Sequence, residues 1–381
     1  QSDLSHQKRE VVFRRSLREY TYWQTFILFY SFFMVNKVSA KFSPSLSPSK
    51  RANSSSASKR IAVIDILRGF ALVGILLIHI PIFARPGAPP GTSFDGRWYN
   101  ELILAGLIFL IESKFFSLFA SLFGVSFALQ MQAAEAKERP FVPTFIRRNF
   151  FLALFGILHI VLLWEGDILF LYALAGFILL RFRKSTDKTL WRWIISLLGI
   201  PLLVFLISLA GLAVARQDPA TSPIISFYES QFTADFVQAR VEVMRRYASD
   251  DITRTVFQRT IDYLSNFGLL LARLPTVLAL FLFGFYVGRR NILADVEKHR
   301  PLIKQICIWS WIFGLPVNLL ITWGFLTLRP FSSFTALAVN QVLGGPLLAL
   351  AYATSLVLVH QRMPQNNFLR SLGTSILLGA T

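Results

Sequence analysis

The stretch RIAVIDILRGFALVGILLIHIPIF, residues 60–83, is long and apolar enough to cross a lipid bilayer, yet it contains Asp65, Arg68 and His79. Ionisable side chains at membrane depth are costly and usually face a bundle interior or a water-filled cavity. Arg68 and His79 are eleven residues apart and so share one face of a helix, with Asp65 one turn before Arg68. The stretch therefore predicts a transmembrane helix with a polar stripe that faces protein.

Long apolar blocks recur along the 381-residue chain, which is 54% hydrophobic and has 37 Phe residues. This composition is unusual for a soluble domain, and the blocks are too continuous for the alternating strands of a membrane barrel. We therefore predict an all-α fold, a polytopic helical membrane bundle of about 8–10 transmembrane helices. The expected spans are 61–83, 115–132, 149–164, 168–181, 192–214, 266–288, 305–326 and 334–358, with further apolar stretches at 101–111 and 368–381.

The first 60 residues differ in composition from the rest. Residues 1–60 contain basic clusters and a Ser/Pro-rich linker, and the apolar stretch 20–36 fits a signal-like segment, an interfacial helix or a weak span. Residues 61–381 form the predicted multi-pass membrane domain. Its single cysteine, Cys307, excludes an internal disulfide.

Basic residues predict the orientation of the bundle. If the segment before residue 61 is cytoplasmic, every inward loop carries Lys or Arg, as the positive-inside rule requires. These inward basic residues are Lys137, Arg139, Arg147, Arg148, Arg183, Lys184, Lys188, Arg289, Arg290, Lys298, Arg300, Lys304 and Arg362. We therefore expect a multi-pass protein of the cell (plasma or inner) membrane, with a cytoplasmic N-terminal segment and extracytoplasmic helices at about 215–265. The net charge of +18 then reflects these loops, and no nucleic-acid-binding motif is present.

A second predicted span repeats the spacing of the first. RNFFLALFGILH at 148–159 aligns with RGFALVGILLIH at 68–79, so that Arg148 and His159 are again eleven residues apart. The next turn contains Glu165 and Asp167. Asp167 could cap the following helix, or either carboxylate could orient a histidine as a general base. Two unrelated helices, each with an interfacial Arg and a packed His, would give the same pattern.

These patterns define the candidate site. The candidate catalytic residues are His79, His159, Glu165 and Asp167, and the candidate substrate-binding residues are Asp65, Arg68, Arg147 and Arg148. Their spacing does not support a metal site.

Small residues at helical spacing predict close helix packing in two places. Ser121, Gly124 and Ala128 form one such face, and Gly284 and Gly288 form another. The GGP sequence at 344–346 is expected to bend its helix.

Four segments resemble the YeiB-like membrane proteins, the family called domain of unknown function 418. They are the first span, FFSLFASLFGVSFALQ, RRNFFLALFGILHIVLLWEGDILFLYALAGFILL and LPTVLALFLFGFYVGRRNIL, and the resemblance covers about 60–360. The family is thought to be related to transmembrane acyltransferases. The resemblance therefore implies a bundle that takes acyl-CoA from the cytoplasm and modifies an acceptor on the far side. His79 departs from the Asn usual in the family, whereas the acyltransferases often have His there.

Three functions remain open from the sequence. The first is a membrane acyltransferase that uses acyl-CoA as donor and a small molecule or glycan as acceptor. The second is a transporter of a small polar solute lined by the same residues. The third is a non-catalytic membrane partner protein. The lipid bilayer is the expected partner in all three, and no nucleic acid is expected.

Overall fold

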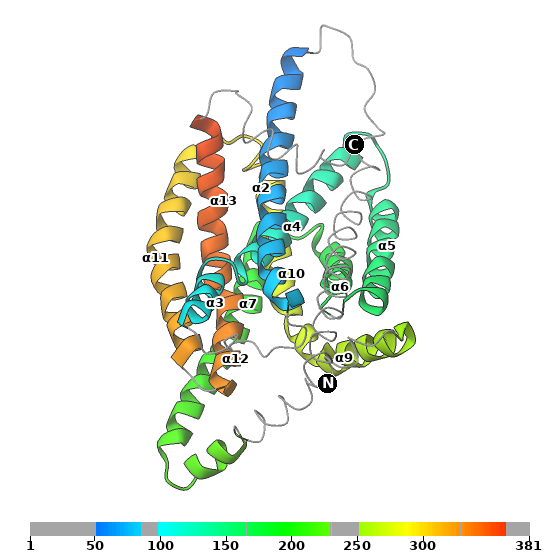
Figure 1. Cartoon of the computed structure of the whole chain (residues 1–381). Coiled ribbons are helices and arrows are strands. Elements are labelled where there is room, and N and C mark those ends of the chain that lie inside the picture. Colours follow the sequence, from blue (N-terminus) through cyan, green and yellow to red (C-terminus); the bar gives the residue numbers. More distant parts are fainter. Residues whose placement is uncertain are drawn as a thin grey trace, which may run out of the picture.

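The structure, a computed structural model, describes residues 51–84, 98–164, 166–228, 230, 251–327 and 330–362. All regular secondary structure in these ranges is helical (Figure 1). The elements are α2 (Arg51–Ala84), α3 (Trp98–Leu110), α4 (Lys114–Glu135), α5 (Phe141–Leu162), α6 (Leu169–Leu179), η2 (Leu180–Phe182), α7 (Asp187–Gln217), α9 (Ile252–Ala272), α10 (Leu274–Arg289), α11 (Arg300–Thr327), α12 (Pro330–Val339), the π-helical η3 (Asn340–Gly344) and α13 (Gly345–Arg362).

Length and hydropathy confirm a polytopic helical bundle. Six helical segments of the described ranges can each cross a membrane, and α9 with α10 adds a seventh if the bent pair counts as one span. The apolar segment Leu169–Phe182 is shorter than a full span. The expected apolar stretches 20–36 and 368–381 lie outside the described residues. By the length and composition of its helices, the chain is therefore a multi-pass membrane protein.

Some helix boundaries differ from those predicted. The span expected at 266–288 is divided, because α9 ends at Ala272 and meets α10 at an angle of 53°. Pro275 stands in the first turn of α10, where its missing N–H costs no helical hydrogen bond. α5 begins at Phe141 rather than at residue 149, so Arg147 and Arg148 lie within the helix instead of in the preceding loop.

The apolar stretch at 101–111 is also part of a longer element. α3 and α4 together form one candidate span, Trp98–Glu135, which breaks at residues 111–113. Ser113 adopts a left-handed backbone conformation with φ of 67° at this break. A second irregularity, the π-helix η3, lies just before α13, where the GGP sequence predicted a bend.

The two faces of small residues pack against each other, as their spacing predicted. A Cβ atom added to Gly284 would clash with the Ser121 carbonyl oxygen, and one added to Gly124 would clash with the Phe281 carbonyl oxygen. At Gly288 an added Cβ would come within 2.7 Å of the Ala128 methyl group. α4 and α10 therefore touch along their backbones. Phe127, Phe281 and Phe285, all fully buried, fill the core beside this contact.

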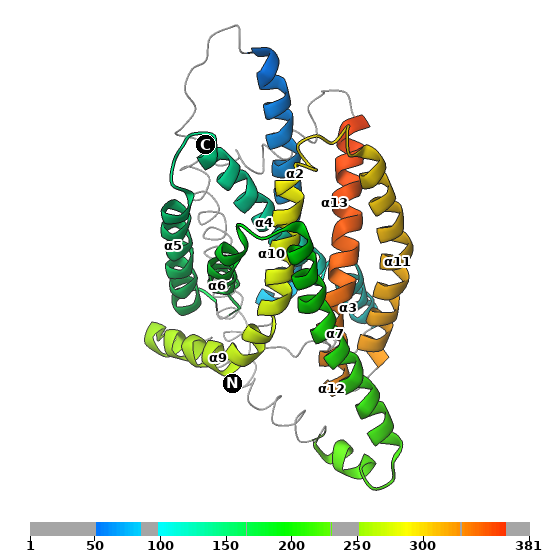
Figure 2. The same ribbon diagram turned by 180° about the vertical axis from the view of Figure 1, so that it is seen from behind.

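The basic connections all lie at one end of the bundle (Figures 1 and 2). This end holds the start of α2, the α4–α5 connection, the start of α7, the α10–α11 connection and the end of α13. We call it the basic end. α9 and the α5–α6 turn lie at the opposite end.

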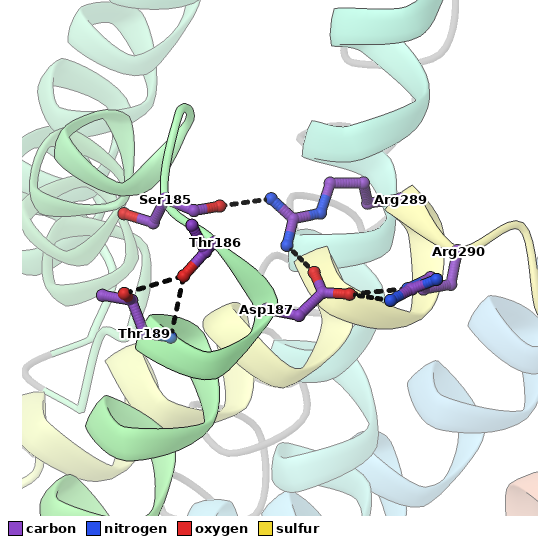
Figure 3. Close-up of polar contacts among 6 residues, drawn as sticks. All are labelled: Ser185, Thr186, Asp187, Thr189, Arg289 and Arg290. Carbon is purple, nitrogen blue, oxygen red and sulfur yellow. Dashed lines mark hydrogen bonds and ion pairs between the residues drawn. The ribbon is translucent and has the colours of Figure 1, made fainter.

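An ion-pair cluster fastens α7 to α10 at the basic end (Figure 3). Asp187 bonds to both Arg289 and Arg290, and Arg289 also donates to the Ser185 carbonyl oxygen at 2.6 Å. Thr186 caps α7 by accepting a hydrogen bond from the Thr189 N–H at 3.3 Å. Arg289 and Arg290, two basic residues of this end, therefore hold α7 and α10 together.

Candidate functional site

α2 and α5 carry the repeated Arg-to-His spacing and run in the same direction. Both begin at the basic end, and α4 packs against each of them (Figures 1 and 2). Eleven residues of helix separate Arg from His by about 16 Å along each axis. Parallel helices with equal spacing can bring the two arginines together at one level and the two histidines together at another.

The arginines do approach each other across α4. Arg68 bonds to Asp65 at 3.2 Å and donates to the Ser126 hydroxyl at 2.6 Å. Arg148 donates to the Gln130 side chain at 2.8 Å. Ser126 and Gln130 are one turn apart on α4, so this helix holds both guanidinium groups, whose charges lie within electrostatic range of each other. We call Arg68 and Arg148 the arginine pair.

The histidines also come together, near the α5–α6 turn. His159 Nδ1 lies 2.9 Å from Asp167 Oδ2, although the two groups are not aligned as a hydrogen bond. His79 packs its ring edge-to-face with Trp164, with centroids 4.7 Å apart, and its ring lies within electrostatic range of His159. We call His79, His159 and Asp167 the histidine cluster.

Asp167 makes both of the contacts that the sequence left open: it caps the following helix and it contacts a histidine. Its Oδ1 accepts a hydrogen bond from the Phe170 N–H at 2.9 Å in the first turn of α6, while Oδ2 faces His159. The side chain is 1% exposed, against 11% for His159. Capping fixes the carboxylate, and the fixed carboxylate can in turn orient the imidazole.

Close packing of α5 on α6 places these groups. Gly156 lies so close to the backbone of Phe170 that a Cβ atom there would clash. Asn149, which is buried, donates from its side-chain amide to the Ala173 carbonyl oxygen at 2.7 Å. These contacts fix how far α6 lies from α5 and hence where Asp167 meets His159.

α9 adds two residues that the sequence analysis did not single out. Arg259 and Tyr263 are one turn apart and buried at 6% and 9% exposure. Arg259 donates to the Leu162 carbonyl oxygen, and Tyr263 lies within electrostatic range of Asp167. Among the described residues, the Tyr263 hydroxyl has no hydrogen-bond partner. Nothing in the local sequence of α9 connects these side chains with a turn about 100 residues earlier.

Two of the candidate residues do not join either group. Arg147 is exposed, as Arg148 is, but it points about 100° away from Arg148 around the axis of α5. Glu165 lies outside the described residues.

A second polar cluster lies inside the bundle where two helices are irregular. Lys114, fully buried, donates from Nζ to the Ile108 carbonyl oxygen at 2.7 Å and to Asn340 Oδ1 at 3.2 Å. Asn318, also fully buried, donates to the Gly344 carbonyl oxygen at 2.9 Å. The sequence analysis missed Lys114 because the predicted span began at residue 115. The available signal was a lysine at the end of a short polar triplet, residues 112–114, between two apolar stretches.

Comparison with known proteins shows which proteins the chain is similar to. Residues 287–374 match the family described as "Protein of unknown function (DUF418)". The "Uncharacterized protein YxaH" of Bacillus subtilis (strain 168) is 29% identical over 334 residues, which cover 82% of this chain and 76% of that protein. The "Uncharacterized protein YeiB" of Escherichia coli (strain K12) is 33% identical over 162 residues, which cover 39% of this chain and 40% of that protein.

No solved structure matches the chain. The names of these relatives state no activity, so the expected relation to acyltransferases stays a prediction. The sequence matches and the helical bundle agree with the family resemblance, and the chain is similar to the DUF418 family of proteins of unknown function.

Proposed function

We propose that this protein is a membrane acyltransferase that moves an acyl group from acyl-CoA to a hydroxyl or amine acceptor. The observation that carries the proposal is the double juxtaposition on α2 and α5. Arg68 approaches Arg148, and His79 approaches His159, with each Arg about 16 Å from its His along the helix. Because the two helices are parallel and their Arg-to-His spacing is equal, a match at the arginine level also brings the histidines to one level.

The arginine pair suits the phosphates of the donor. Guanidinium groups bind phosphate with charge-assisted hydrogen bonds, often two at a time. Asp65 and Ser126 occupy only some of the donors of Arg68, and Gln130 contacts one nitrogen of Arg148. A donor whose phosphates lie at these residues could extend its thioester toward the histidine cluster, about half the hydrocarbon thickness away.

The histidine cluster suits the transfer step. With Nδ1 turned to Asp167, the His159 ring can use Nε2 as the base. Nε2 takes the proton of the acceptor hydroxyl or amine, the acceptor oxygen or nitrogen bonds to the thioester carbonyl carbon, and the carbon–sulfur bond breaks. The CoA thiolate leaves and takes up the proton from the imidazolium. Asp167 stabilises that imidazolium, and His79 assists from the neighbouring helix.

An acyl-transfer assay tests the proposal. The purified protein in proteoliposomes would receive radiolabelled acetyl-CoA together with a panel of amino sugars and polyols. We expect label to reach an acceptor, and we expect His159→Ala to lower the rate by 10²-fold or more, as loss of a general base does. Asp167→Asn keeps the size of the side chain and should lower the rate less.

The control is His299→Ala, which removes a histidine from the α10–α11 connection at the basic end. It should leave the transfer rate unchanged. Equal rates in the wild type, His79→Ala and His159→Ala, all with wild-type thermal stability, would contradict the proposal.

Transport of a small polar solute is a second candidate, favoured by the cluster around Lys114. Ionisable residues buried inside membrane bundles and broken helices are both typical of transporters. Here a buried lysine lies beside the left-handed Ser113 and bonds to Asn340 at the start of the π-helix. Solute uptake by proteoliposomes without acyl turnover, abolished by Lys114→Ala, would support this function over the first.

A further inference from the structure

A cavity of about 430 Å³ lies at the basic end between α11 and α13. It is lined by Glu297, Arg300, Pro301, Lys304, Leu358 and Arg362. Since a water molecule takes up about 30 Å³ of liquid, this volume equals that of about fourteen water molecules and can hold a phosphate group with its substituents. The arginine pair and the histidine cluster are not part of its lining.

The charge of this cavity is unbalanced. Three cationic side chains face one carboxylate, which leaves two positive charges in excess. Glu297 lies 3.9 Å from Arg300 and accepts a hydrogen bond from the Gln361 amide at 3.1 Å. Lys304 and Arg362 have no acidic partner within the described part of the chain. The first turn of α11 at Arg300 adds the positive end of a helix dipole.

Apolar side chains line part of the cavity and continue on the protein surface beside it. Pro301 and Leu358 give it apolar walls. Leu302 and Val359, the residues next to these two, are 43% and 41% exposed on the outer surface of α11 and α13. Cations therefore lie directly above an apolar surface that would face lipid chains. A ligand with a charged phosphate and an attached hydrocarbon chain matches both the cations and the apolar surface.

We infer that this cavity is a binding site for an anionic phospholipid, with the lipid phosphate between Lys304, Arg300 and Arg362. The acyl chains would lie along the exposed apolar faces of α11 and α13. Clusters of Lys and Arg at the cytoplasmic ends of transmembrane helices attract anionic lipids, and the positive-inside rule predicts the cytoplasm on this side. A zwitterionic lipid carries its own ammonium group and would meet repulsion from the excess positive charge.

The site is separate from that of the proposed acyl donor. α11 and α13 lie on one side of α2, and α5 lies on the other (Figures 1 and 2). Failure of lipid binding would therefore leave the acyltransferase proposal standing, and the reverse also holds.

Native mass spectrometry of the full-length protein tests the inference. Protein released from mixed micelles would be titrated with phosphatidylglycerol and, separately, with phosphatidylcholine. We expect one phosphatidylglycerol to be retained in preference to phosphatidylcholine. Each cation near a membrane surface is worth about a fivefold change in affinity, so Lys304→Gln should weaken binding about fivefold. The triple variant Arg300→Gln/Lys304→Gln/Arg362→Gln should weaken it about a hundredfold.

The matched control removes three exposed cations of the same end that do not line the cavity, as Lys137→Gln/Arg139→Gln/Lys184→Gln. It should bind phosphatidylglycerol like the wild type. The inference is overturned if both triple variants lose the lipid equally, or if the cavity variant retains it. It is also overturned if free CoA or inorganic phosphate displaces the lipid at micromolar concentration, since the site would then favour a soluble phosphate ligand.

Discussion

Gly284→Ala should force apart the close backbone contact between α4 and α10. The added Cβ atom would meet the carbonyl oxygen of Ser121 and, at 3.0 Å, the backbone nitrogen of Val125. Both atoms belong to the backbone of α4 and cannot turn aside as a flexible side chain could. α4 and α10 would have to move apart, and the packing of Phe281 and Phe285 beside them would loosen.

Two opposing contributions determine how much stability Gly284→Ala would cost. Overpacking in a close-packed core costs typically 1–3 kcal/mol, and a clash with backbone belongs at the upper end. Alanine in place of glycine within a helix contributes up to about 1 kcal/mol in the opposite direction. We therefore expect the free energy of unfolding to fall by about 2 kcal/mol.

Thermal unfolding in detergent, followed by gel filtration after heating, measures this loss. The control is Gly211→Ala in α7, where an added Cβ atom meets nothing within 4 Å. The control should match or slightly exceed the wild type in thermal stability. If Gly284→Ala is as stable as Gly211→Ala, then α4 and α10 do not pack through their glycines and the reasoning is wrong.

Three further predictions concern the polar groups. Lys114→Ala leaves the Ile108 carbonyl oxygen without its hydrogen bond and creates a cavity, so unfolding should become easier by about 2–5 kcal/mol in the same assay; an unchanged midpoint would contradict this. Asp187→Asn weakens half-exposed ion pairs at the basic end, so the loss should be only about 1 kcal/mol and should shrink in 1 M salt; a loss that is insensitive to salt argues against an ionic role. Tyr263→Phe removes a hydroxyl without a partner in the described chain and should change stability by less than about 0.5 kcal/mol; a loss above 1 kcal/mol would reveal a hidden hydrogen bond.

Features set by local spacing could be predicted from the sequence. The small residues around Gly124 and Gly284 identify a contact face because helical periodicity alone places them on one side. The basic loops share one end of the bundle for a similar reason, since alternate connections of a multi-pass chain return to the same side. The all-helical membrane fold follows from apolar blocks that must satisfy their own backbone hydrogen bonds.

Features that depend on contacts between distant segments could not be predicted in the same way. The residues directly before and after Arg273 are apolar, so hydropathy alone does not reveal the 53° bend between α9 and α10, and Pro275 was the available signal. The sequence left open whether Asp167 caps a helix or contacts a histidine, and only the packing of α6 on α5 shows that it does both. Tyr263 reaches the same place from α9, through a contact that no local pattern could indicate.

The central claim is that α2 and α5 bring His79 and His159 together, and cross-linking tests it most directly. In a Cys307→Ser background, the pair His79→Cys/His159→Cys would be treated with a short bifunctional maleimide, and the linked tryptic peptides would be identified by mass spectrometry. We predict efficient cross-linking of this pair. The control pair His79→Cys/Ile157→Cys should link poorly, because Ile157 is 46% exposed on the outer side of α5. No link between positions 79 and 159, or equal links in both pairs, would contradict the account.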